Sequence, residues 1–301
     1  MIDQIVALFQ FFFDSVFSVG TTFASYAGSA TDTMLTTIIN NTATAIKPIG
    51  YSLLCVFALL EFAQLSERVG NVTGFMGAGL VINVLVKLIL CKLVIDNSTE
   101  ICGFLMNLGD NITQIISNSL PHGVFDPNAL YNGIKNAFPN WWDILGQIGF
   151  FLVSCLFIFI SCLGILIVKI IFLARFIQLF VYTAVSPIPL STCLSKHFNV
   201  APNFIKSFFS VCLQGALLIL IKGIFYSIFV TQINSVANIT QGDWGALWSM
   251  LGSILFYSIL FVVTAFQTQK WANSICHAML HDALPILTIC LVSAFKADTK
   301  S

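Results

Sequence analysis

Four stretches of the sequence are long and apolar enough to cross a lipid bilayer as helices. They cover residues 72–95, 144–168, 203–230 and 246–268, and a shorter stretch covers residues 49–65. An α-helix rises 1.5 Å per residue, so about 20 residues cross the hydrocarbon layer, which is about 30 Å thick. The sequence therefore predicts an all-α, polytopic membrane helix bundle with about five transmembrane helices.

The composition of the 301-residue chain excludes several classes of protein. Its residues are 57% hydrophobic and only 9% charged, whereas a soluble domain carries about 25% charged residues. So few charges cannot coat a surface that faces water. This excludes a soluble enzyme, a soluble nucleic-acid-binding module and a disordered linker.

The N-terminal segment, residues 1–45, is predicted to be extracytoplasmic and to begin with an amphipathic helix. Apolar residues recur at helical spacing over residues 2–19, and Asp3 and Asp14 flank the apolar part. The stretch is too short and too acidic for a comfortable span. We therefore expect this helix to lie at the membrane interface.

A sixth apolar block, residues 170–190, is interrupted by Pro187 and Pro189, and the topology depends on whether this block crosses the membrane. Short cytoplasmic loops collect Lys and Arg. If the block does not cross, most of the basic residues fall on the inner side. These inner residues are Arg68, Lys169, Arg175, Lys196, Lys206, Lys270, Lys296 and Lys300. If the block crosses, the rule fails across the second half of the chain.

Charge placement therefore favours five spans in the cytoplasmic membrane, with the N-terminus outside and the C-terminus inside. Crossing by residues 170–190 stays open as the alternative. In the favoured layout this block extends the third helix at the cytoplasmic face and turns back at Ser186-Pro187-Ile188-Pro189. Each proline removes a backbone donor and pushes the residue before it out of helical geometry. The block is then either a re-entrant element or a plain loop after a long helix.

This layout divides the rest of the chain into four segments. A predicted extracytoplasmic loop, 96–143, separates a first helical hairpin, 46–95, from a core transmembrane bundle, 144–280. The last segment, 281–301, is a tail of doubtful authenticity. The run His281–Ile286 is what the end of a common short-read sequencing adapter encodes in one reading frame. Our hypothesis is that this tail is an assembly artefact, and we assign it no function.

Ionisable residues inside apolar helices are the first functional suspects. Glu61, Lys87 and Lys222 belong to this class. In the predicted layout Glu61 lies near the inner end of its helix and Lys87 toward the outer end of its own, which gives a proton-relay pair little support. The lysines either snorkel to the headgroups or line a pore. Gln214 and Gly215 indicate helix packing, because a small residue lets two helices approach closely.

The residue patterns of catalysis are missing from the sequence. The four histidines are dispersed, without the spacing of a helical metal site. The sequence has neither a nucleophile elbow nor a phosphate-binding loop. We therefore expect no enzymatic activity, no cofactor and no metal. An ATPase for any energy-coupled machine would lie on another chain.

Residues 173–229 carry a resemblance to a known family. The motifs that carry it are Ala174-Arg175-Phe176, Ala184-Val185-Ser186-Pro187-Ile188-Pro189, Phe204-Ile205-Lys206-Ser207-Phe208 and Leu213-Gln214-Gly215. An arginine-bearing hydrophobic helix thus leads into a proline turn, a short basic segment and another long span. This order resembles the TrbL-type conjugal transfer membrane proteins, the polytopic inner-membrane component of type IV secretion systems.

The resemblance implies a non-enzymatic channel or scaffold subunit that forms a homo-oligomer in the bilayer of the cytoplasmic membrane. Such a subunit helps to pass single-stranded DNA, with its bound protein, between cells. Its partners would be the ATPase, the coupling protein and the surface components of the secretion system, on separate chains.

The residues add a compatible feature, a basic inner face that would meet DNA cargo or anionic lipid. Its members are Lys169, Arg175, Lys196 and Lys206. The positive-inside rule alone would also account for these charges. The alternative function is a small-solute transporter or permease subunit, although such proteins usually show internal repeats.

Overall fold

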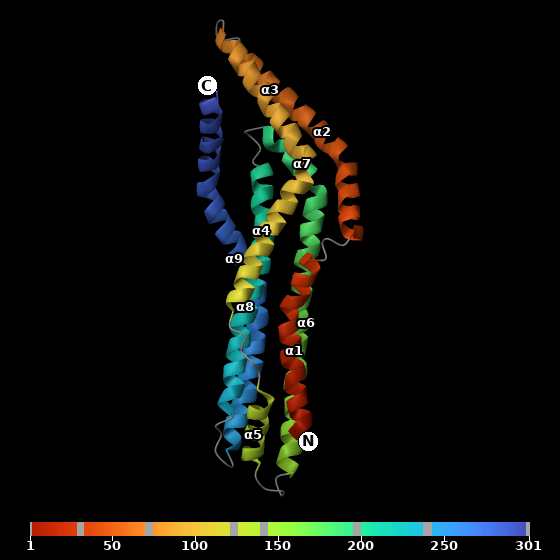
Figure 1. Ribbon diagram of the computed structural model, residues 1–301, viewed down its shortest axis with the longest axis vertical. Helices are drawn as coiled ribbons and strands as arrows, with labels where there is room; N and C mark the ends of the chain where they lie inside the picture. Colours follow the sequence, from red (N-terminus) through yellow and green to blue (C-terminus); the bar gives the residue numbers. More distant parts are fainter. Residues whose placement is uncertain are drawn as a thin grey trace. The chain divides into compact units, whose positions relative to one another are not determined.

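The regular structure of the described residues is helical (Figure 1). The computed structural model describes residues 2–28, 33–69, 75–120, 126–138, 144–194, 200–236 and 243–298. Its long helices are α1 (Ile2–Gly28), α2 (Thr33–Val69), α3 (Phe75–Asp96), α4 (Ser98–Ser119), α6 (Ile144–Val185), α8 (Val200–Val236) and α9 (Trp244–Asp298). The short elements are α5 (Pro127–Ala137), α7 (Pro187–Leu190) and the 3-10 helix η3 (Ser191–Leu194). The side chains of the tail, 281–301, lie outside the described residues.

Four of these helices are long and apolar enough to cross a membrane, which confirms the predicted polytopic helix bundle. The spans are Thr37–Glu67 in α2, Leu145–Val185 in α6, Val200–Ser235 in α8 and Trp244–Ala278 in α9. The predicted span at 72–95 forms α3, and residues 72–74 lie outside the described residues.

The spans differ in how much of their apolar surface the protein itself covers. The most apolar window of α8 is 67% buried, against 28% for that of α6. Protein therefore packs around α8, whereas α6 leaves most of its apolar side chains open to lipid or to another copy of the chain. Lipid tails are as apolar as these side chains, so this exposure carries no cost inside a bilayer.

The chain folds as two compact units, each made of segments that are distant in the sequence. Unit 1 comprises Met1–Gly28, Asn111–Phe176 and Gly215–Thr268. Unit 2 comprises Ser29–Asp110, Ile177–Gln214 and Gln269–Ser301.

In unit 1, aromatic rings join α1 to α8. Phe12 is fully buried and meets Phe229 edge to face, with 5.6 Å between the ring centroids. Phe13 meets Tyr226 in the same way at 6.0 Å. The amphipathic helix predicted at 2–19 is present, but its apolar face packs on α8 rather than lying open to the membrane interface. Complementary rings supply close dispersion contacts that a fluid lipid surface does not.

The segment predicted as an extracytoplasmic loop, 96–143, is mostly helical, because α4 and α5 occupy much of it. Asp126 caps α5 by accepting a hydrogen bond from the Asn128 backbone N–H at 2.9 Å. Pro127 follows in the first turn, where a missing N–H costs nothing.

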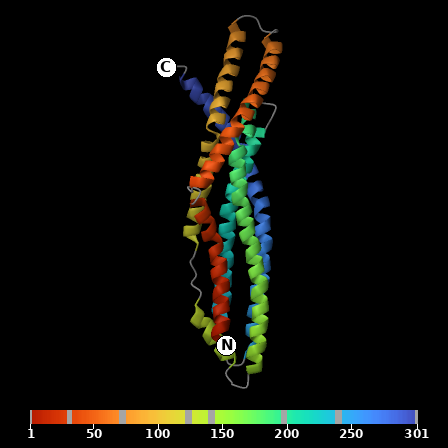
Figure 2. The same ribbon diagram turned by 90° about the vertical axis from the view of Figure 1, so that its right-hand side faces the viewer.

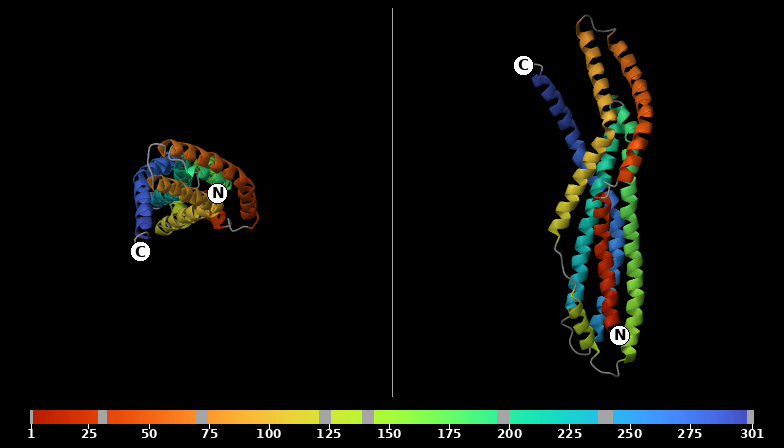
Figure 3. Two further views of the ribbon diagram at one scale, coloured as in Figure 1. Left: turned by 90° about the horizontal axis from the view of Figure 1, so that it is seen from above. Right: turned by 45° about the vertical axis from the view of Figure 1, so that its right-hand side comes forward.

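In unit 2, α2 and α3 lie side by side as the predicted helical hairpin (Figures 2 and 3). Leu54 and Ala58 of α2 are buried in a cluster with Cys91 and Ile95 of α3. Their spacing of four residues on each helix places each pair on one face. The hairpin therefore has an apolar seam along its facing sides.

Candidate functional site

The sequence around the two prolines forms a break that ends α6 and starts two short helical turns. α6 ends at Val185 after 42 residues, and α7 begins at Pro187. Pro187 cannot donate to the carbonyl oxygen of Thr183, as an N–H at that position would in a continuous helix. The Ser186 hydroxyl donates to that carbonyl instead, at 2.8 Å. The Thr183 carbonyl thus keeps hydrogen-bond donors at the break, the Ser186 hydroxyl and the Ser186 backbone N–H.

Ser186 differs from the prediction made for residues that precede proline. It keeps helical dihedral angles, φ −50° and ψ −31°, rather than moving to extended geometry. Proline disfavours the helical region for the preceding residue without forbidding it. Here the hydroxyl bond to Thr183 and the burial of Ser186 hold the residue in the helical region. The chain therefore bends through consecutive helical turns instead of an open loop.

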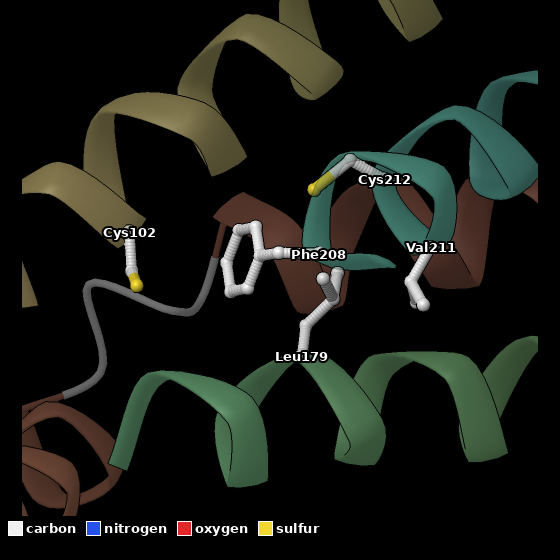
Figure 4. Close-up of a cluster of buried hydrophobic side chains, with 5 residues drawn as sticks. All are labelled: Cys102, Leu179, Phe208, Val211 and Cys212. Atoms are coloured by element: carbon white, nitrogen blue, oxygen red, sulfur yellow. The ribbon is translucent and has the colours of Figure 1, made fainter. Parts of the chain in front are cut away.

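The chain reverses direction at this break, as the sequence predicted. In unit 2, Tyr182 of α6 contacts Phe204 of α8, with 5.9 Å between ring centroids. Three residues earlier on α6, Leu179 packs with Phe208, which lies four residues later on α8. Figure 4 shows the Phe208 ring between Leu179 and Cys102, with Cys102 contributed by α4. The end of α6 and the start of α8 are therefore antiparallel neighbours, with α4 packed against both.

The α2–α3 hairpin packs against the break, where the backbone of α2 closely approaches the backbone of α7. A Cβ atom added at Gly50 of α2 would lie 2.9 Å from the backbone oxygen of Pro187. Real Cβ atoms do not approach backbone that closely, so only glycine permits this approach of α2 to α7. Gly50 therefore determines where α2 of the hairpin packs against α7.

These contacts contradict one feature of the predicted topology. The five-span layout places Gly50, at the outer end of the predicted span 49–65, and the Pro-broken segment on opposite faces of the membrane. In unit 2, Gly50 lies against Pro187, and the side chain of Cys102 is hydrogen-bonded to Ser186. A hydrocarbon layer of about 30 Å cannot separate groups in contact. The alternative left open by the sequence, a separate crossing by residues 170–190 after the span 144–168, is not formed either, because Ile144–Val185 is one continuous helix.

The five-span topology was wrong about the relative positions of Gly50 and Pro187 because it depended on few charged residues. In the second half of the chain the decision rested mainly on Lys196 and Lys206 and on the basic residues after them. The positive-inside rule is a statistical bias, and it does not constrain which helices pack together. Lys196 lies outside the described residues, and Lys206 is half-buried on α8.

A polar cluster that sequence reasoning missed joins the two helices of the hairpin beside the break. Lys47 Nζ donates to the backbone oxygen of Asp96 at 2.8 Å, and the Tyr51 hydroxyl is hydrogen-bonded to the Asp96 carboxylate. The signal for this cluster was available. Lys47 and Asp96 stand at opposite ends of the predicted 46–95 hairpin, and a hairpin brings its two ends together.

Burial shifts the acidity of two groups on α4, which lies outside the four spans. It raises the pKa of the half-buried Asp110 carboxyl above its ordinary value. It also raises the pKa of the Cys102 thiol to about 11, against a smaller opposing effect of the hydrogen bond with Ser186. Desolvation disfavours the charged form of both groups. Cys102 is therefore protonated at neutral pH and acts as a small buried packing residue.

The described members of the predicted basic face belong to different units. Lys169 and Arg175 are half-buried in unit 1, whereas Lys206 belongs to unit 2. Lys169 and Arg175 are six residues apart on α6, so their side chains leave the helix about 120° apart. Lys196 lies outside the described residues, so a basic face made by all four residues stays a prediction.

The intramembrane ionisable residues lie on three different helices. Glu61 on α2, Lys87 on α3 and Lys222 on α8 are each half-buried. Gln214 and Gly215 are both buried on α8, the most deeply packed span. Among the described residues, no group of three or more His, Cys, Asp or Glu side chains could hold a metal ion. A comparison with models of known protein families finds no match, and no curated protein matches the sequence.

Proposed function

We propose that this multi-pass membrane protein is a non-enzymatic channel or scaffold subunit of a type IV secretion system in the cytoplasmic membrane. The observation that carries the proposal concerns residues 173–229, where the resemblance to TrbL-type proteins lies. Their described part forms a helix, a proline break and a returning helix. The α2–α3 hairpin packs against the break through α2. The break therefore consists of hydrogen-bonded helical turns that also pack against α2.

The exposure of the spans supports a role within an assembly. Most of the apolar window of α6 is open, with Leu156 and Phe159 more than half exposed. Such a face is satisfied either by lipid or by a second copy of the chain. A homo-oligomer built through such faces would line the path for single-stranded DNA, and the ATPase and coupling protein would act from separate chains.

Deletion of the gene tests the proposal against a solute transporter. We expect deletion to abolish transfer of a conjugative plasmid between cells and to leave solute uptake unchanged, with transfer restored by a plasmid-borne copy. Normal transfer by the deletion strain would overturn the proposal. Loss of uptake of one solute with normal transfer would instead support the permease.

Substitution of Pro187 tests the part of the site on which the proposal depends. Pro187→Ala restores a backbone donor to the Thr183 carbonyl and should straighten the break, so we expect impaired assembly and transfer. Pro202→Ala is the matched control. Pro202 lies in the first turn of α8, where backbone N–H groups have no partner in the helix. Equal transfer by both variants and the wild type would show that the break has no role in transfer.

A further inference from the structure

Two cysteines from distant parts of the chain meet in unit 2. Cys91 lies on α3 and Cys193 on η3, and the two thiols lie close enough to interact with each other. The two elements are also in contact along their backbones. Cys91 is buried, whereas Cys193 is exposed. An exposed thiol therefore lies beside a buried one.

Both cysteines are held on well-supported backbone. Cys91 lies inside a regular helix and packs in the apolar seam of the hairpin. In η3, the Thr192 hydroxyl donates to the Pro189 carbonyl at 2.8 Å and accepts from the Ala201 N–H at 3.0 Å. The Ser191 hydroxyl donates to the Ile188 carbonyl at 2.7 Å. Cys193 thus follows two anchored residues, and the approach of the two sulfurs does not depend on a mobile loop.

We propose that Cys91 and Cys193 are a redox-sensitive pair whose disulfide locks α3 to the Pro-broken segment. Reduced, the two elements are held by non-covalent contacts alone. Oxidised, they are joined covalently, so the hairpin cannot separate from the Pro-broken segment. This inference stands on the contacts of unit 2 and does not rest on the proposed function.

The chemistry is thiol–disulfide exchange with an oxidant of the disulfide class, such as a thiol oxidoreductase in its oxidised form. The Cys193 thiolate attacks one sulfur of the oxidant's disulfide, which breaks that bond and releases one oxidant thiolate. The Cys91 thiolate then attacks the Cys193 sulfur and releases the second. The pair loses two electrons and two protons, and the two oxidant sulfurs take them up as thiols.

The surroundings of the pair assign the order of attack. The interaction with Cys91 lowers the pKa of the Cys193 thiol, because it stabilises the thiolate. The thiolate is the nucleophile in such exchange. Cys193 is also the more exposed of the two, so it meets the oxidant, and the buried Cys91 resolves the mixed disulfide.

Peptide mapping of the wild-type protein tests the pair directly. Membranes holding the full chain are treated with diamide, an azo compound that is reduced to the hydrazine as two thiols become a disulfide. Free thiols are then blocked with N-ethylmaleimide. We expect a linked peptide that joins Cys91 to Cys193, that disappears with dithiothreitol, and that is accompanied by slower backbone hydrogen exchange at residues 191–194.

Two variants serve as controls for this experiment. Cys193→Ser changes an exposed side chain, and it should lose both the linked peptide and the diamide effect on exchange. Cys155→Ser, at an exposed thiol on α6, should keep both. Folded wild-type protein with Cys91 and Cys193 both alkylated and unlinked after diamide would overturn the proposal. Linkage of Cys193 to a different cysteine would do the same.

Discussion

Unit 1 contains many contacts between aromatic rings, whereas unit 2 combines ring and apolar contacts with a helix break and with polar contacts between distant segments. The ring pairs of unit 1 include Phe12–Phe229, Phe13–Tyr226, Phe138–Trp244, Phe150–Trp248 and Phe225–Phe261. In unit 2, Lys47 and Tyr51 bond Asp96 across the hairpin, and the Ser210 hydroxyl donates to the Asn273 side-chain oxygen at 2.5 Å.

The difference teaches which physical features each unit depends on. Ring packing is broad and weakly directional, so unit 1 is sensitive to lost volume. A hydrogen bond or a close backbone approach depends on placement, so unit 2 is sensitive to small displacements. Substitutions that remove volume should therefore act most strongly in unit 1, and those that shift backbone or delete a polar partner should act in unit 2.

The most decisive prediction for unit 2 concerns the contact between α2 and the Pro-broken segment, which requires both regions to lie on the same side of the membrane. Thr44 is exposed on α2, two turns before Gly50, and Cys193 is exposed on η3. We expect Cys193 of the wild type and the cysteine of a Thr44→Cys, Cys193→Ser variant to react with a membrane-impermeant maleimide from the same side. The measurement is peptide-resolved labelling of intact and of opened cells. Reaction from opposite sides would restore the layout inferred from charge and overturn the contacts of unit 2.

The largest change in stability should come from Phe12→Ala in unit 1. The substitution leaves a cavity beside Phe229, and large-to-small changes at buried phenylalanines cost about 3–5 kcal/mol. The measurement is the free energy of unfolding in mixed detergent micelles, with hydrogen exchange to show that the loss falls on α1 and α8. Phe11→Ala is the matched control, since Phe11 is 64% exposed. If both variants lose the same stability, the ring contacts of α1 do not hold unit 1.

The sequence predicted the features that depend on one helix at a time. Apolar length located the four spans of α2, α6, α8 and α9, helical spacing located the amphipathic α1, and Pro187 and Pro189 located the end of α6. Each of these follows from local composition or from a missing backbone donor, without knowledge of the partner helix.

The features that the sequence did not predict depend on which helices meet. Nothing in the spacing of Gly50 and Pro187, or of Cys91 and Cys193, shows that these residues touch. Apolar helices in a membrane have many partners of similar hydrophobicity, so the choice among them depends on shape and on a few polar contacts. The positive-inside rule was used in place of knowledge about helix partners. That rule placed residues 170–190 on the opposite side of the membrane from Gly50.

Gly50→Ala should show the sensitivity of unit 2 to a small displacement. The added methyl group meets the Pro187 backbone, which cannot swing aside, so we expect a loss of about 1–3 kcal/mol from overpacking. Gly103→Ala on α4 is the matched control, because nothing lies within 4 Å of a Cβ there. That variant should gain about 0.5–1 kcal/mol from helix propensity. Both values come from the free energy of unfolding, and equal effects of the two variants would remove the close approach of α2 to α7.

The smallest effect should come from Tyr51→Phe, which deletes one hydrogen bond and keeps the ring. The Tyr51 hydroxyl bonds the Asp96 carboxylate, while Lys47 holds the backbone oxygen of the same residue and remains in the variant. Side-chain hydrogen bonds in membrane proteins contribute about 0.6 kcal/mol on average and at most about 1.7 kcal/mol. We expect a loss in this range, together with faster hydrogen exchange at the end of α3. Ser52→Ala is the control, because the exposed Ser52 hydroxyl donates only within its own helix, to the Pro48 carbonyl. If Tyr51→Phe changes exchange no more than Ser52→Ala, the hairpin is held by its apolar seam alone, and unit 2 resembles unit 1 more closely than its polar contacts indicate.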